Sequence, residues 1–214
     1  MRTVVDALAP AFERRRGCTV TRVYDSSVAL MQRIDAGETG DAAVFTAAAI
    51  DALIAQHKVA RRTDLARSFV GVAVRKGAPR PDITTPDAFR QTMLAAKSIA
   101  RSKTGASGLY FAALITRLGL DDALGPKMTV QDGIVGSLAA RGEVEIAVQQ
   151  ISELMQADGV DIVGPLPDAL QSVTVFSAGV FTTSRESDIA DAFIADLAAP
   201  AHAALIRQKG MEPA

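Results

Sequence analysis

Short loops rich in hydroxyl groups and glycine precede four of the helices expected in this sequence. The loops are Asp25-Ser26-Ser27, Thr104-Gly105-Ala106-Ser107-Gly108, Gln131-Asp132-Gly133 and Gln149-Gln150-Ile151-Ser152. The first turn of a helix carries unpaired N–H groups and a partial positive charge, so a loop of Ser, Thr or Gly lets an anion approach the backbone closely. The chemistry predicted here is anion binding, although Ser and Asp at a helix start are also ordinary caps.

Three carboxylates lie in or beside these loops, at Asp25, Asp132 and Glu153. Each could serve as a general base, but the sequence favours a helix-capping role for each over a catalytic one. The loop GASG (105–108) has neither the GxGxxG nor the GxxxxGK[ST] spacing of a nucleotide-binding loop. It also lacks the GxSxG spacing of a nucleophile elbow, so Ser107 is not expected to be a catalytic serine.

Metal, cofactor and nucleic-acid sites are not expected. His57 and His202 stand in helical contexts without paired-ligand spacing, and Cys18, read as a small buried apolar residue, is the only cysteine. The net charge is −1 and the longest basic run is Arg14-Arg15-Arg16, which is no electrostatic footprint for nucleic acid. No run of 18 apolar residues is present and no secretory signal precedes the first expected helix.

Apolar periodicity predicts alternating strands and helices. Strands are expected at 18–24, 41–45, 68–77, 97–101, 127–130, 144–150, 160–164 and 172–183. Helices are expected at 2–16, 28–37, 48–56, after a Thr85 cap with Pro86 in the first turn, from the 104–108 loop to 117, and at 132–142, 151–159, 187–200 and 201–210.

This alternation predicts an α/β fold with parallel or mixed sheets. The segments 68–76 and 172–183 are long enough to pass between two lobes. We therefore expect a discontinuous first lobe (1–70 plus 180–214) and a second lobe (75–175).

The order DSSVALMQRIDAGETGDAAVF, SFVGVAVRKGAP, GASGLY and RGEVEIAV, followed by a closing helix pair, resembles the molybdate-binding, periplasmic solute-binding proteins of ABC transporters. The resemblance covers nearly the whole chain, and its most specific part is SS followed by a short helix, Gly and D-x-x-V-F. It implies a two-lobed, type II periplasmic-binding-protein-like fold with mixed sheets and two crossing strands. It also implies an oxyanion held between the lobes by hydroxyl and backbone N–H groups.

The resemblance implies ligand-binding roles for Ser27, for Ser107, for a donor near Asp132, and for Gln150, with their neighbours Ser26, Gly108 and Gly133. Gln150 stands where the family has a tyrosine, and Asp132 brings a negative charge towards the anion, which costs binding energy unless Lys103 or Arg101 offsets it. A small organic carboxylate is therefore expected to suit the site about as well as molybdate.

The family begins with a strand that ends in Ala-Ser, and Met1 falls just after that position. Either the true start lies upstream, or the first lobe lacks a central strand. In the second case we expect reduced stability or a gap filled by another segment. The resemblance implies a periplasmic location, whereas a true start at Met1 would imply a cytoplasmic one.

We expect a monomeric solute-binding protein that closes on a small anion and serves ABC-transporter membrane subunits, without catalysis. The alternative is an isomerase of a small tricarboxylate, similar to aconitate isomerase, with Glu153, Asp132 or Asp25 as the base. A third reading is a helper lobe for another protein, with no ligand.

Overall fold

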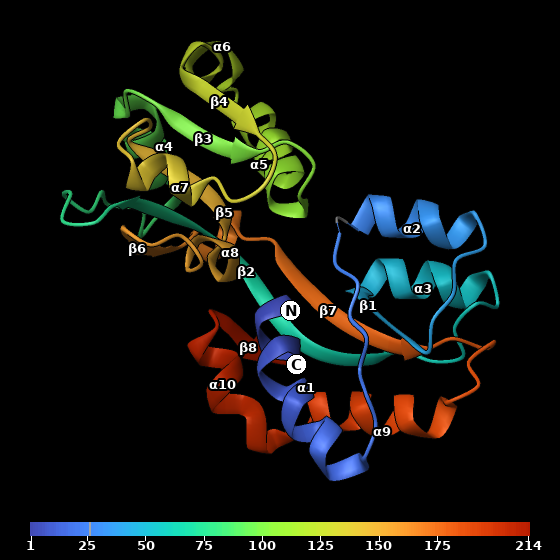
Figure 1. Ribbon diagram of the computed structural model, residues 1–214. Coiled ribbons are helices and arrows are strands. Elements are labelled where there is room, and N and C mark those ends of the chain that lie inside the picture. The colour runs from blue at the N-terminus through green and yellow to red at the C-terminus, as the bar shows by residue number, and fades with distance from the viewer. Residues whose placement is uncertain (26) are drawn as a thin grey trace. The chain divides into compact units, whose positions relative to one another are not determined.

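The computed structural model describes residues 1–25 and 27–214, and its chain divides into two compact units (Figure 1). Unit 1 consists of Met1–Arg67 and Thr174–Ala214, and unit 2 of Ser68–Val173. The divisions fall inside the two longest strands, β2 (Thr63–Arg75) and β7 (Val173–Val180). The α/β fold class with mixed sheets is thereby confirmed.

Unit 1 builds a sheet in the order β1-β7-β2, with the short strand β8 also paired to β2. Strand β1 runs antiparallel to β7, with Val44 opposite Ala178. Its other elements are α1 (Arg2–Arg16), α2 (Ser27–Asp35), β1 (Ala42–Thr46), α3 (Ala47–Ala55), α9 (Ser187–Leu197), α10 (Ala203–Gln208) and β8 (Met211–Pro213).

Two apolar clusters hold unit 1 together, one on each face of this sheet. Helices α1, α9 and α10 pack on one face through residues such as Phe12, Phe193 and Leu197, and the Phe12 and Phe193 rings lie 4.9 Å apart. Helices α2 and α3 pack on the other face against Phe45 and Phe181. Figure 1 shows these two helix layers on opposite sides of β1 and β7.

Unit 2 pairs the second half of β2 with β5 and β6, and continues from β5 through β3 to β4. Strands β3, β4 and β5 are mutually parallel. Its elements are α4 (Pro86–Ala95), β3 (Ile99–Ser102), α5 (Ala106–Arg117), α6 (Asp121–Leu124), β4 (Met128–Gln131), α7 (Gly136–Ala140), β5 (Ile146–Gln150), α8 (Ile151–Leu154) and β6 (Val160–Pro165).

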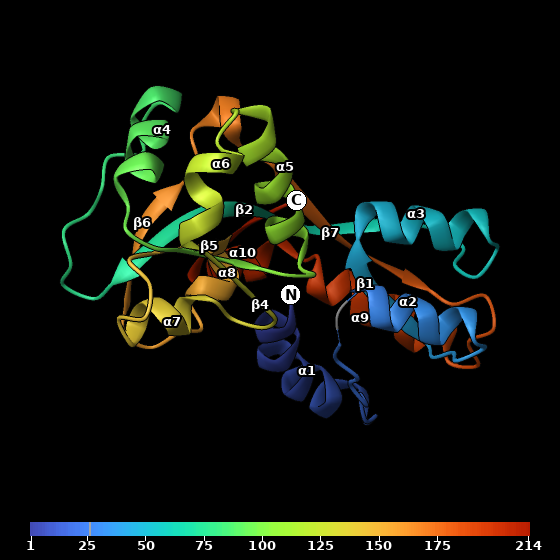
Figure 2. The same cartoon turned by 90° about the horizontal axis from the view of Figure 1, so that it is seen from above.

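The second half of β2 and strands β3 and β5 are largely buried on both faces, with large side chains on one and alanines on the other. Ile99, Ile146 and Val148 face α4, α5 and α6, whereas Ala100 and Ala147 face α7 and α8. Figure 2 shows the two helix layers on opposite sides of the strands. Because period-2 side chains point alternately to the two faces, the small residues allow α7 and α8 to approach the sheet closely.

One predicted strand is wrong. Residues 18–24 form neither helix nor strand, and Val20 donates its N–H to the Glu13 carboxylate at 2.8 Å rather than to a neighbouring strand. Alternating residues become a strand only beside a partner, and no described strand lies next to this segment. Cys18 is half-buried rather than buried, and it packs at the margin of the α1–α9 cluster.

Most other expected elements are present, and the predicted Thr85 cap with Pro86 in the first turn of α4 is confirmed. The α6 turn and β8 were not anticipated, because four and three residues are too few to show a period. No single described helix is long and apolar enough to cross a membrane. Two consecutive helical segments reach the required length and apolar composition only when they are counted together, and they are bent relative to each other; they are Ser187–Leu197 and Pro200–Gln208.

Candidate functional site

Three of the four candidate loops meet at one edge of the unit 2 sheet. Because β3, β4 and β5 are parallel, their carboxyl ends at Ser102, Gln131 and Gln150 lie along the same edge. Ligands of open α/β sheets bind at this edge. The topology therefore brings together the loops containing Ser107, Asp132 and Gln150.

Hydrogen bonds join the loops that follow β3 and β4. The Lys103 N–H donates to the Gln131 carbonyl at 2.8 Å, and the Thr104 hydroxyl donates to Asp132 Oδ1 at 3.1 Å. Asp132 thus faces the 104–108 loop, as expected for a residue of a shared site.

The loop after β4 is also held from β5, by the buried side chain of Gln149. Its Oε1 accepts from the Val135 N–H and its Nε2 donates to the Gly133 carbonyl, both at 2.9 Å. Gly133 has a φ of +82°, a backbone conformation that favours glycine. The amide of Gln149 therefore fixes this turn from both its donor and its acceptor side.

Helix α5 begins without a side-chain cap. Its N-cap residue is Gly105, whose own N–H donates to Ser102 Oγ at 2.9 Å. The first intrahelical bond runs from the Leu109 N–H to the Gly105 carbonyl, so the first-turn amides of residues 106–108 have no acceptor within the helix.

Ser107 has a buried hydroxyl with no partner. It is 1% exposed, and within residues 1–25 and 27–214 its Oγ makes no hydrogen bond. A buried polar atom without a partner costs stability, so such an atom calls for an explanation. Placed at the uncapped start of a 12-residue helix, it suits a ligand that accepts hydrogen bonds.

Gly108 has a packing role that is independent of any ligand. A Cβ at this position would lie 1.9 Å from the Ser102 carbonyl oxygen, so only glycine lets α5 start so close to β3.

Gln150 is buried within a polar cluster. The Ser68 hydroxyl donates to Gln150 Oε1 at 2.8 Å and lies 3.3 Å from the Ser152 hydroxyl. This network orients the side-chain amide of Gln150.

Glu153, in the first turn of α8, is a half-buried carboxyl. Burial raises the pKa of Glu153 above the ordinary range, and hydrogen bonds from the Gln150 backbone and the Gln149 side chain oppose that shift. A carboxyl whose pKa is raised holds its proton more strongly and, once ionised, is a stronger base than an exposed carboxylate.

Neither cation proposed to offset Asp132 forms an ion pair with it among the described residues. Arg101 donates instead to the carbonyls of Ser102 and Gly108, at 3.1 and 3.3 Å. Its guanidinium therefore places a positive charge beside the start of α5.

The remaining candidates belong to unit 1. Ser27 is the first residue of α2 and is exposed, as is Asp25. Ser26 lies outside the described residues. The loop 25–27 follows no strand, since 18–24 is not one, which corrects the expected strand–loop–helix order at this junction.

Sequence reasoning did not name Ser68 or Ser102, and it named Gln149 only as part of the 149–152 loop; all three are buried polar residues. Each interrupts or ends an apolar strand, and that interruption was the available signal. No group of three or more His, Cys, Asp or Glu side chains suited to a metal ion occurs in the described part of the chain.

Comparison with known proteins relates this chain to bacterial solute-binding proteins and to an aconitate isomerase. A family profile described as bacterial extracellular solute-binding protein matches residues 1–212. An aconitate isomerase of Pseudomonas sp. is 36% identical over 215 residues, covering 96% of this chain and 82% of that protein.

Two molybdate-binding proteins are more distant. That of Escherichia coli (strain K12) is 27% identical, over 75% of this chain and 66% of its own length. The periplasmic molybdate-binding protein of Azotobacter vinelandii has a similar fold, with a TM-score of 0.77, 19% identity and coverage of 98% and 94%.

Proposed function

This chain belongs to the bacterial extracellular solute-binding protein family, and we propose that it binds a small anion at the carboxyl ends of β3, β4 and β5. The observation that carries the proposal is the buried Ser107 hydroxyl, which has no hydrogen-bond partner in the part of the chain that the structure describes and lies at the start of α5, where no side chain caps the helix. In this proposal an anionic oxygen accepts from that hydroxyl and from the first-turn amides, while Arg101 contributes positive charge.

Gln150 supplies a further polar group, because its amide is oriented by Ser68. Asp132 accepts from Thr104, and the turn at Gly133 supplies backbone groups. The resemblance adds Ser27, with Ser26 beside it, as a donor from unit 1. In a transporter, the loaded protein would deliver the anion to ABC-type membrane subunits outside the cytoplasm, as its family relationship suggests.

We propose a small polycarboxylate, rather than molybdate, as the ligand. The 36% identity to an aconitate isomerase exceeds the 27% identity to a molybdate-binding protein. A carboxylate near Asp132 can also share a proton, which lowers the repulsion that a permanently charged oxyanion would meet there.

A thermal-shift panel with trans-aconitate, cis-aconitate, citrate, molybdate and sulfate tests the proposal, because a ligand stabilises the state that binds it. We expect a rise in the melting temperature with a polycarboxylate, and a ten- to hundredfold lower affinity for Ser107→Ala, since a hydrogen bond to a charged group contributes about 1.5–3 kcal/mol. Ser98→Ala is the control, because Ser98 Oγ accepts from the Glu145 N–H at the amino end of β3.

The Ser107→Ala chain alone, without ligand, should melt no lower than the unmodified chain, since the substitution removes an unsatisfied hydroxyl. If the Ser107→Ala chain bound the anion as tightly as the unmodified chain, the proposed anion site would be refuted. No shift with any of the five anions would refute the proposed ligand class.

The second candidate function is isomerisation of a small tricarboxylate, which the identity to an aconitate isomerase favours. In this mechanism the Glu153 carboxylate removes a proton from the substrate carbon next to its double bond. The electron pair shifts over the allylic carbons, and the proton returns at the other end. Burial of Glu153 raises its pKa, which makes it a stronger base than an exposed carboxylate.

Incubation of the protein with trans-aconitate, followed by NMR, distinguishes the two functions. If the protein is an isomerase, cis-aconitate accumulates, and Glu153→Gln lowers the rate at least a hundredfold while binding persists. If the protein binds trans-aconitate without converting it, the isomerase function is excluded and solute binding for transport is supported. If Glu153→Gln converts trans-aconitate as fast as the unmodified chain, Glu153 is excluded as the base.

A further inference from the structure

Gln149 is a buried polar side chain to which neither proposed function assigns a role. It is the residue before the end of β5 and is 2% exposed. Because side chains alternate along a strand, Gln149 lies on the same face of the unit 2 sheet as Ala147, towards α7 and α8. A buried amide carries a strong donor and a strong acceptor, and leaving either unpaired costs stability. Both groups of Gln149 are paired, and both partners belong to the turn that follows β4.

Two hydrogen bonds fix which way round the amide of Gln149 lies. Its Oε1 accepts from the Val135 N–H, and its Nε2 donates to the Gly133 carbonyl. If the amide were turned over, its oxygen would face the Gly133 carbonyl and its NH2 group would face the Val135 N–H, so both contacts would be repulsive. The amide therefore holds the Gly133 carbonyl oxygen on the buried side of the turn, towards β5.

The Ile134 N–H points the other way. No cis peptide bond occurs among the described residues, and in a trans peptide unit the C=O and the N–H point in opposite directions. Since the Gly133 carbonyl and the Ile134 N–H belong to one peptide unit, this N–H points away from Gln149. Within residues 1–25 and 27–214 the Ile134 N–H has no hydrogen-bond acceptor. The turn thus offers a backbone donor on the side opposite to β5.

The groups around this N–H suit an anion. The Ile134 carbonyl, whose oxygen would repel an anion, accepts from the Ser137 hydroxyl at 2.7 Å. On the other side of the turn, Asp132 accepts from the Thr104 hydroxyl, so the turn adjoins the loop that leads to Ser107. The Ile134 N–H and the Ser107 hydroxyl are therefore donors on neighbouring loops, and neither has an acceptor in the part of the chain that the structure describes.

We propose that Gln149 is a positioning residue of the anion site: it holds the Gly133 carbonyl away from the anion and thereby presents the Ile134 N–H to it. This role rests on the proposed function, in which an anion binds at the carboxyl ends of β3, β4 and β5. Without the amide, the peptide unit between Gly133 and Ile134 can rotate, because glycine permits many backbone angles. Its carbonyl oxygen can then face the anion and repel it. Gln149 thus acts on the affinity through the turn and not by touching the anion.

Hydrogen exchange followed by NMR tests this role in the unmodified chain, with trans-aconitate and molybdate as the two probes. An amide that gains an acceptor exchanges more slowly. With trans-aconitate at saturation, we expect the amides of residues 106–108 and of Ile134 to exchange at least about tenfold more slowly than in the free chain. The Val135 amide, which already donates to Gln149, should exchange slowly with and without the anion.

Gln149→Met removes both hydrogen bonds and keeps about the same side-chain length. Without ligand, we expect the Val135 amide of the variant to exchange at least about tenfold faster than that of the unmodified chain. At saturating trans-aconitate, the amides of residues 106–108 should still slow, whereas the Ile134 amide should slow by less than about twofold. The affinity for trans-aconitate should fall about tenfold or more, the effect of one lost hydrogen bond to a charged group.

Lys127→Met is the matched control for the loss of two hydrogen bonds between a side chain and the backbone. Lys127 Nζ donates to the Leu94 and Ala96 carbonyls, at 2.6 and 2.7 Å, at the amino end of β4. With a rise of about 3.3 Å per residue, the four residues of β4 place this charge about 13 Å from the proposed site, beyond the Debye length of about 8 Å. We expect its affinity for trans-aconitate to stay within about threefold of the unmodified chain.

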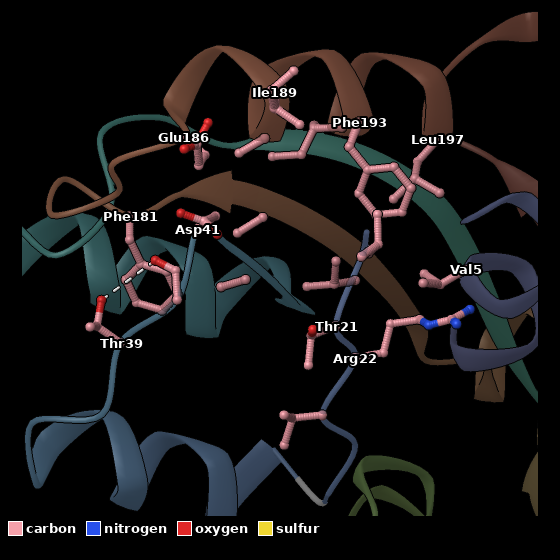
Figure 3. A pocket seen from close by; sticks show the side chains of 18 of the residues that line it. Val5, Thr21, Arg22, Thr39, Asp41, Phe181, Glu186, Ile189, Phe193 and Leu197 are labelled. Carbon is pink, nitrogen blue, oxygen red and sulfur yellow. Dashed lines mark hydrogen bonds between the residues drawn. The ribbon is translucent and has the colours of Figure 1, made fainter. Parts of the chain in front are cut away.

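A cavity in unit 1 supplies an internal reference within the same chain. It measures about 540 Å³ and is lined by β1, by the segment 18–23 and by residues of α2 and α9. Figure 3 shows α9 and α2 on opposite sides of this cavity. The Phe181 N–H donates to the Asp41 carbonyl, and antiparallel pairing alternates, so the Val44 N–H points away from β7. No proposed anion contact of unit 2 lines this cavity, so the Val44 amide should exchange equally fast with and without the anion.

The outcomes separate the role of Gln149 from anion binding itself. If the amides of residues 106–108 slow and the Ile134 amide does not, the anion site stands and the positioning role is wrong. If neither probe slows any of these amides, the proposed function fails and the positioning role fails with it. The positioning role is also overturned if the Val44 amide slows as much as that of Ile134, or if Gln149→Met loses no more affinity than Lys127→Met.

Discussion

At the residue scale, the most informative feature is the buried hydroxyl of Ser107, whose Oγ has no hydrogen-bond partner among the described residues and lies at a helix start without a side-chain cap. Buried polar atoms are nearly always paired in folded proteins. The exception lies beside the first-turn amides of α5, and the positive charge of Arg101 lies near the same turn. A ligand that accepts hydrogen bonds resolves all three features together.

Glu153 gives a prediction for pH dependence. Burial raises its pKa in the folded chain, so the folded state binds more protons than the unfolded state over the pH range between the ordinary and the raised value. The stability contributed by protonated Glu153 is complete below the ordinary pKa and is lost as pH rises through the raised one. We expect Glu153→Gln to raise the melting temperature more at pH 8 than at pH 4, measured by calorimetry.

Glu143→Gln serves as the comparison, because Arg141 lowers the pKa of the exposed Glu143 carboxyl through a side-chain hydrogen bond. The pKa of Glu143 is shifted in the opposite direction to that of Glu153, so the melting temperature of the Glu143→Gln variant should not rise at pH 8. A melting difference for Glu153→Gln that stays constant from pH 4 to pH 8 would contradict the burial of that charge.

At the element scale, the start of α5 depends on a close approach to β3 that only glycine permits. Gly108→Ala would put a methyl group 1.9 Å from the Ser102 carbonyl oxygen, which is backbone and cannot move away cheaply. We expect a loss of about 1–3 kcal/mol or more in the free energy of unfolding, measured with urea.

Gly125→Ala is the matched control for that substitution. Gly125 has helical backbone angles (φ −48°, ψ −51°), and a Cβ there would meet nothing within 4 Å. We expect a change of less than about 1 kcal/mol, because the smaller entropy of the unfolded chain favours alanine whereas Pro126 disfavours helical angles for an alanine directly before it. Equal losses for the two variants would show that general glycine effects, rather than the α5–β3 contact, set the cost.

At the scale of the whole molecule, ligand stabilisation should be measurable although the chain is large. A ligand at 100 times its Kd adds about 2.7 kcal/mol to the free energy of unfolding. For a chain of this size, 1 kcal/mol corresponds to a shift of about 2–4 °C, so the panel proposed above has a clear signal.

The sequence by itself determined the α/β class, most helices and strands, and the loops at which an anion could bind. Local signals suffice for these features: apolar period, the cap at Thr85 with Pro86, and glycine-rich turns before helices. The resemblance to solute-binding proteins also followed from motifs that are short and ordered along the chain.

Only the tertiary structure decided which polar residues contact one another and which expected strand does not form. Gln149 clamps the Gly133 turn and Ser68 orients Gln150 across gaps of 16 and 82 residues, which no local pattern encodes. Residues 18–24 alternate as a strand does, yet they stay unpaired. A strand is stabilised by the neighbour it pairs with, so its formation depends on what lies beside it in space rather than on its own sequence.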